Sequence, residues 1–238
     1  MSENLYAPPQ ADLGTEAAGD LGSGDFEIGR CVSEAWARTW ANFPLWLGAG
    51  VVFVLAMAGS VVSILGIVLA LPVLFWGAFL FFLRMYDGGA AIGDLFAGFS
   101  RYGAALAGSL AWWLLSLVAG VVGQTPYFIA SAAESVPCMI GGYVLALLVS
   151  FLVTARTFPA MFLMVDRRLP IGEAFSLSWA RTGPVMWKLV GLQLASMLVA
   201  LAGVIALFVG AIPASVVIYL MFVSAYRQIF GRAAAASV

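Results

Sequence analysis

Few residues of this chain are of the types that carry out chemistry. Its 238 residues include no histidine and only two cysteines, Cys31 and Cys138, which lie far apart and form no CxxC pair. Without imidazole, the chain has no Ser-His-Asp or Cys-His pair, no histidine ligand for zinc or haem, and no imidazole acid or base near neutral pH. The sequence therefore excludes most hydrolase and metalloenzyme mechanisms. We predict a non-enzymatic protein with no cofactor and no metal site.

Carboxylates are the remaining candidates for catalysis. Asp87, Asp94, Asp166 and Glu173 lie near the ends of apolar segments, and a membrane enzyme would have to draw its acid and base from this set. No glycine pair is followed by the Lys-Ser/Thr of a phosphate-binding loop. An enzyme is thus the third alternative, behind two non-enzymatic ones.

Uncharged polar side chains inside the apolar segments form a second group of candidates. The amide of Gln193 cannot be fully satisfied by its own helix, which favours an interhelical hydrogen bond over a ligand contact. Tyr143 and Tyr219 are the other two intramembrane candidates. The predicted spans contain no ionisable residue, which argues against proton or sodium coupling but leaves room for an uncoupled conduit. A conduit predicts that Gln193→Leu alters solute flux.

The composition identifies the elements that must position these groups. The chain is 63% hydrophobic and 10% charged, with a mean hydropathy of +1.02, whereas soluble domains are about 25% charged. Since a span needs about 20 apolar residues, we predict an all-α integral membrane fold with six transmembrane helices arranged as three hairpins. The predicted spans are residues 43–62, 65–83, 104–123 and 139–155, followed by a hairpin within 187–225 that breaks near 209–213.

An amphipathic interfacial helix is predicted before each hairpin. From Phe26, apolar residues recur at three- and four-residue steps, with Asp25 as a candidate N-cap and a Glu34–Arg38 ion pair on the polar face. Residues 34–36, Glu-Ala-Trp, resemble Asp-Leu-Phe at 94–96 and Glu-Ala-Phe at 173–175. We interpret this similarity as a weak threefold internal repeat.

The basic residues predict the orientation. With six spans, all 11 Lys and Arg residues fall on one side, so the positive-inside rule predicts a multi-pass protein of the cytoplasmic (inner) membrane with both termini in the cytoplasm. Arg167, Arg168, Arg181 and Lys188 are candidate contacts for lipid headgroups or for a protein partner.

Three regions follow from these patterns. Residues 1–24 are acidic and rich in Pro and Gly, which predicts a disordered tail. Residues 25–232 form the six-helix transmembrane domain, and 233–238 form a short C-terminal tail. Within the first tail, Leu5, Tyr6, Pro8 and Pro9 are a candidate docking peptide. A featureless tail is the alternative.

Four motifs resemble a bacterial membrane family. They are Tyr-Ala-Pro-Pro at 6–9, Glu-Ala-Trp at 34–36, Phe-Leu-Met-Val-Asp at 162–166 and Glu-Ala-Phe-Ser-Leu-Ser at 173–178. Together they resemble uncharacterised six-span bacterial inner-membrane proteins, some labelled as the membrane domain found beside glycerophosphodiester phosphodiesterases. The resemblance covers about 26–232 and implies a fold without an activity. The phosphodiesterase catalytic domain uses paired histidines, which this chain lacks.

Two non-enzymatic functions remain. The first is a membrane scaffold or accessory subunit that engages a cytoplasmic or membrane protein partner through its N-terminal tail. The alternative is a passive or partner-driven transporter or channel for a small or lipidic solute. The lipid bilayer is a partner in both cases and nucleic acid in neither, and the oligomeric state stays open.

Overall fold

Helices and their short connections make up all of the chain that the structure describes. The computed structural model describes residues 24–63, 65–132, 136–205 and 210–232, and contains no strand within them. Almost all of the predicted N-terminal tail, with Leu5, Tyr6, Pro8 and Pro9, lies outside the described residues. So does the predicted C-terminal tail.

Six helices in the described residues are long and apolar enough to cross a membrane. The structure therefore confirms the predicted all-α class and the six membrane-length segments. In chain order they are α2 (Phe43–Val61), η1 with α3 (Gly66–Ala70 and Leu71–Asp87), α5 (Tyr102–Ala132), α6 (Val136–Asp166), α8 (Met186–Ile205) and α9 (Ala211–Phe230).

Two of these helices are longer than predicted. Helices α5 and α6 contain 31 residues each and continue through Pro126 and Pro159. At 1.5 Å per residue each is about 46 Å long, more than the ~30 Å of hydrocarbon. The predicted segments 104–123 and 139–155 were too short because neither proline ends its helix. Packing against a neighbouring helix lets a membrane helix tolerate proline.

A π-helical turn, η1, leads from the first hairpin tip into α3. Gly66 opens this turn so close to the end of α2 that a Cβ there would lie 2.1 Å from the carbonyl oxygen of Ser60. Only glycine fits this approach. Pro72 follows in the first turn of α3, where its missing N–H is tolerated.

The second helix of each hairpin lies at the centre of the molecule. Helices α3, α6 and α9 contact one another, and aromatic rings fill the space between them. Phe79 of α3 contacts Phe162 of α6 at 5.2 Å and Tyr219 of α9 at 6.1 Å, and Phe158 contacts Phe222 at 4.5 Å between ring centroids. Within the described residues, the centre is therefore a packed aromatic core.

Each segment that precedes a hairpin packs against the central helix of another hairpin. Helix α1 (Ile28–Ala41) lies along α9, η2 (Ile92–Phe96) and α4 (Ala97–Ser100) lie along α3, and α7 (Ile171–Thr182) lies along α6. The middle residues of the three similar motifs, Ala35, Leu95 and Ala174, are all buried. This cyclic pattern is what a threefold repeat would produce, and the repeat stays a prediction.

The predicted interfacial helices need correction in detail. Before α5 there is only a 3₁₀ turn and one four-residue helical turn, because the segment is too short for an amphipathic helix. The N-cap of α1 is Glu27 and not Asp25. The apolar residues of α1 also do not share one environment, since Cys31 is buried against the bundle while Trp36 and Trp40 are exposed.

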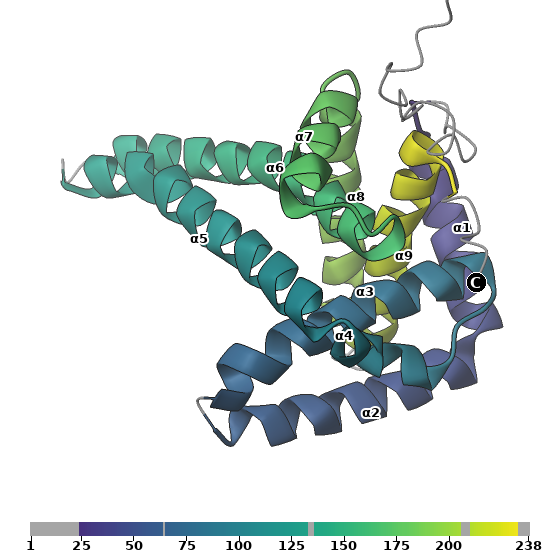
Figure 1. Cartoon of the computed structure of the whole chain (residues 1–238). Helices are drawn as coiled ribbons and strands as arrows, with labels where there is room; N and C mark the ends of the chain where they lie inside the picture. The colour runs from purple at the N-terminus through teal and green to yellow at the C-terminus, as the bar shows by residue number, and fades with distance from the viewer. Residues whose placement is uncertain (1–23, 64, 133–135, 206–209, 233–238) are drawn as a thin grey trace, which may run out of the picture.

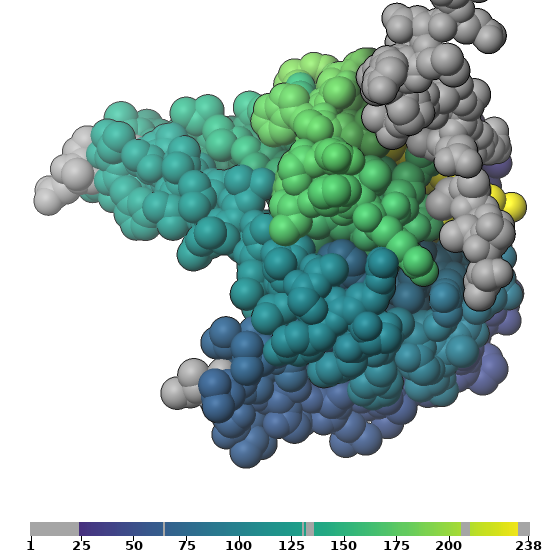
Figure 2. Space-filling model, in the orientation of Figure 1, coloured from purple at the N-terminus to yellow at the C-terminus, as the bar shows by residue number. Residues whose placement is uncertain are grey.

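The outer part of the α5–α6 hairpin projects away from the other helices (Figures 1 and 2). Its exposed residues are almost all apolar, for example Leu114, Leu117 and Val121 on α5 and Val144 and Leu148 on α6. Such a surface suits contact with lipid, where exposed apolar side chains carry no penalty.

Candidate functional site

An apolar cavity lies between α2, α3 and α9. Its volume is about 600 Å³, within the range of small-molecule sites. The lining residues from α2 are Trp46, Leu47, Ala49, Gly50, Val51, Phe53, Val54 and Leu55; those from α3, η2 and α9 are Phe75, Ala78, Phe81, Phe82, Leu95, Ala211, Ile212, Ser215, Val216 and Tyr219. No charged residue is among them.

Helix α2 packs on η1, η2 and α3 but has little contact with α9, and the cavity lies on that side. At the start of α2, the indole Nε1 of Trp46 donates a hydrogen bond to the carbonyl oxygen of Thr39 at 2.9 Å, and the side chain of Ile92 lies against Gly48. The other end contacts η1. Between these points the ring of Phe53 contacts that of Phe75 of α3 at 5.8 Å between centroids. On the side of α9, Ala49 and Gly50 line the space that remains.

Tyr219 lies in the wall of this cavity. Its ring stacks on Phe82 with 4.6 Å between centroids and 2° between planes. Among the described residues, nothing forms a hydrogen bond with its hydroxyl group. The predicted intramembrane candidate is therefore placed where a ligand could meet it.

Gln193 lies elsewhere, between α8 and α6. With its amide oriented to fit its surroundings, the nitrogen donates to the carbonyl of Phe151 at 3.2 Å and the oxygen accepts from the backbone N–H of Ala155 at 3.0 Å. This is the interhelical contact that the sequence favoured. Because Gln193 does not line the 600 Å³ cavity, the expectation that Gln193→Leu acts directly on a solute path finds no support in this geometry.

The cleft beside Gln193 is closed. It lies between α8, α9 and α6, and its free volume is about 10 Å³. In the cyclic packing, α8, α9 and α6 take the places of α2, α3 and α9, so this cleft corresponds to the cavity between α2, α3 and α9. The two spaces differ in their polar contacts, because the amide of Gln193 joins α8 to α6, whereas the described lining residues of α2 form no hydrogen bond with α9.

Tyr143 is not part of either space. It lies on the outer part of α6 with 51% of its surface exposed, and its ring contacts Tyr127 of α5 at 6.2 Å. The three predicted intramembrane residues, Tyr219, Gln193 and Tyr143, are thus in three different environments.

The four residues predicted to contact headgroups or a protein partner lie in different surroundings. Arg167 donates a hydrogen bond to the carbonyl oxygen of Phe230, and Lys188 forms an ion pair with Asp25 at 2.6 Å. That ion pair holds the pKa of the Asp25 carboxyl below its usual value. Arg168 and Arg181 are exposed and have no partner in the described part of the chain.

A buried arginine joins the ends of the three central helices. Arg227 of α9 contacts Asp166 of α6 at 2.5 Å and Asp87 of α3 at 2.6 Å, with 8% of its side chain exposed. The hydroxyl of Tyr226 also donates to Asp166 at 2.9 Å. Sequence reasoning missed this cluster, although Asp87, Asp166 and Arg227 all come at the end of an apolar run.

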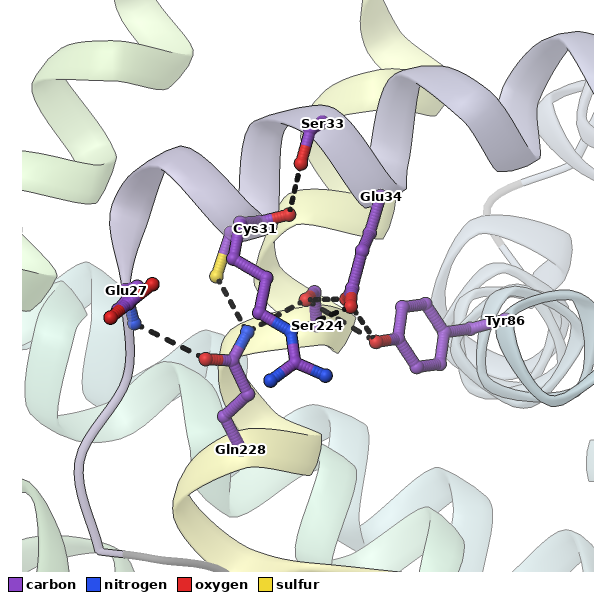
Figure 3. A network of polar contacts seen from close by, with 8 residues as sticks. Glu27, Cys31, Ser33, Glu34, Tyr86, Ser224 and Gln228 are labelled. Carbon is purple, nitrogen blue, oxygen red and sulfur yellow. Dashed lines mark hydrogen bonds and ion pairs between the residues drawn. The ribbon is translucent and has the colours of Figure 1, made fainter.

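A second polar network attaches α1 to the core (Figure 3). Glu34 accepts hydrogen bonds from the hydroxyls of Tyr86 of α3 at 2.5 Å and Ser224 of α9 at 2.7 Å, and from Arg30 at 2.8 Å. The predicted Glu34–Arg38 pair is wrong, since Arg38 lies over the ring of Tyr86.

The same network determines the ionisation of two groups on α1. Burial alone would raise the pKa of the Glu34 carboxyl, but the hydrogen bonds from Tyr86, Arg30 and Ser224 outweigh it and hold that pKa below its usual value. Burial raises the pKa of the Cys31 thiol to about 11. Cys31 is therefore an inert structural thiol at neutral pH.

Two of the four candidate catalytic carboxylates meet at Arg227, and the other two lie apart from them. Asp87 and Asp166 pair with Arg227, and Asp94 pairs with Arg84 of α3. Glu173 is exposed on α7. In the described part of the chain, no group of three His, Cys, Asp or Glu side chains could hold a metal ion. None of these carboxylates lines the cavity.

Comparison with protein-family models, with curated proteins and with solved structures found no match. The resemblance to the membrane domain found beside glycerophosphodiester phosphodiesterases stays a prediction.

Proposed function

We propose that this protein is a non-enzymatic, multi-pass membrane protein that holds a neutral lipidic molecule between α2, α3 and α9. The observation that carries the proposal is the uncharged cavity of about 600 Å³ between α2, α3 and α9. A charged solute would lose its hydration there without gaining a partner. An apolar molecule loses nothing on entering from the bilayer.

The packed centre argues against a channel along the molecular axis. Phe79, Phe158, Phe162 and Phe222 occupy the space between α3, α6 and α9. A route for a solute would instead lie at the edge of the bundle, where α2 stands away from α9. This location favours lateral exchange with the membrane over passage of ions or water.

A cavity-filling substitution tests the proposal. Around Gly50, nothing lies within 4 Å of the position that a Cβ would take, and the residue lines the cavity. Gly50→Phe therefore places a ring in the cavity without a clash at its Cβ. Gly59→Phe is the matched control, because Gly59 lies on the same helix, is equally free of neighbours and does not line the cavity.

The measurement is the lipid that copurifies with each variant from native membranes in mild detergent, quantified by mass spectrometry. We expect a neutral lipid with the unmodified protein and with Gly59→Phe, and its loss with Gly50→Phe. Equal retention by all three proteins, or no retained lipid at all, would contradict the proposal. A protein partner that disappears when residues 2–24 are removed would favour the scaffold function.

A further inference from the structure

We propose that the hydroxyl group of Tyr219 selects the ligand by donating a hydrogen bond to a carbonyl oxygen of a neutral lipid. This inference rests on the proposed function of the cavity and specifies the chemical class of its occupant. Tyr219 then acts as the group that fixes the ligand along the length of the cavity.

The ring of Tyr219 is held in place from two sides. Phe82 stacks on it at 4.6 Å, and Phe79 meets it edge-on at 6.1 Å between centroids. Both contacts involve only the ring, so neither provides a hydrogen-bond partner for the hydroxyl group. None of the described residues supplies one. In hydrocarbon, an unpaired hydroxyl is costly, because no water is present to replace the missing partner.

The other polar groups in the lining are already engaged. Ser215 donates to the carbonyl oxygen of Ile212 at 2.7 Å, and the indole of Trp46 donates to that of Thr39 at 2.9 Å. Among the described lining residues, the hydroxyl of Tyr219 is thus the side-chain donor that remains for a ligand. The matching ligand group is an acceptor oxygen.

The position of Tyr219 along α9 indicates which part of the ligand carries the acceptor oxygen. Tyr219 is the ninth of the 20 residues of α9, about 12 Å along its axis from the first residue. A 20-residue apolar helix is long enough to cross the hydrocarbon, and Tyr219 is near the middle of this one, so we place it away from the headgroups at either end. The acceptor therefore belongs to the apolar part of a molecule. The uncharged lining excludes a carboxylate or phosphate as that acceptor.

Two probes that differ by one oxygen test the inference: a long-chain dialkyl ketone and the alkane of the same chain length. The full-length protein in detergent is incubated with both, and the retained probe is measured by mass spectrometry. Tyr219→Phe keeps the stacked ring and removes the hydroxyl group. Tyr143→Phe, at the exposed tyrosine of α6, is the matched control.

We expect the unmodified protein and Tyr143→Phe to retain the ketone about fivefold better than the alkane, the ratio for one net hydrogen bond. In Tyr219→Phe the preference falls to about one, with alkane retention unchanged. A ketone preference that survives in Tyr219→Phe overturns the role of Tyr219, as does equal retention of both probes by every protein. Retention of neither probe would overturn the cavity function itself.

Discussion

Removal of the Arg227 side chain would leave a charge stranded between the central helices. Arg227 pairs with Asp166 and Asp87, and the side chains of Arg227 and Asp166 are only 8% and 12% exposed. Loss of one partner from a buried ion pair costs about 3 to 5 kcal/mol. Because Asp166 keeps some exposure and a hydrogen bond from Tyr226, we expect Arg227→Ala to cost about 3 kcal/mol.

Thermal unfolding in detergent measures this cost. For a chain of this size, about 3 kcal/mol corresponds to a fall in Tm of roughly 6 to 12 °C. Arg30→Ala is the control, since Arg30 is 62% exposed and Glu34 23% exposed, and helical i,i+4 pairs contribute about 0.3 to 0.5 kcal/mol. Its Tm should fall by roughly 1 to 2 °C.

A second substitution separates the stranded charge from lost packing. If the cost arises from an unpaired Asp166, then adding Asp166→Asn to Arg227→Ala should recover part of the lost stability. Arg227→Lys should lie between the unmodified protein and Arg227→Ala, because an ammonium cannot span two carboxylates as a guanidinium does. A Tm for Arg227→Ala within 2 °C of that for Arg30→Ala would refute the reasoning.

Three further predictions concern α1, the topology and α8. The folded-state pKa of Glu34 is lowered, so the stability that Glu34 contributes is present above its unfolded pKa and is lost as pH falls through its folded pKa. The buried thiol of Cys31 should therefore become reactive to 4,4′-dithiodipyridine at acidic pH. In Glu34→Gln, Cys31 should be reactive already at neutral pH. An impermeant maleimide applied to spheroplasts should modify the exposed Cys138. Cys31 is buried, so the side of the membrane on which α1 lies is better tested with Ser33→Cys. The introduced cysteine should stay unmodified until the membrane is permeabilised. Its labelling in intact spheroplasts would reverse the proposed orientation. Gln193→Leu should lower stability by about 0.6 and at most about 1.7 kcal/mol, the range for interhelical hydrogen bonds, and should leave lipid in the cavity unchanged; loss of that lipid would show that the two clefts are coupled.

Composition alone predicts the fold class because a bilayer restricts the solutions. Runs of about 20 apolar residues must be helical to satisfy their backbone groups, and the structure has six such helices. The helix ends were less predictable. The predicted span ended at 155, yet α6 continues to Asp166 because its last turns pack inside the bundle, where residues 159–165 are buried.

Long-range polar contacts could not be predicted from local spacing. Glu34 has an arginine four residues away on each side, and spacing along the helix allows either pair. Glu34 pairs with Arg30 and also accepts hydrogen bonds from Tyr86 of α3 and Ser224 of α9. A pairing across 52 or 190 positions becomes visible only once the helices are assembled.

The location of the candidate site follows from what α2 lacks. In hydrocarbon, the amide of Gln193 gains by reaching a backbone, and this contact draws α8 onto α6 and closes the cleft between them. Among the cavity-lining residues of α2, Trp46 alone carries a polar side-chain group, and its indole bonds to Thr39 of α1 and not to α9. Among the described residues, α2 thus forms no side-chain hydrogen bond with α9, and an uncharged space remains between the two helices.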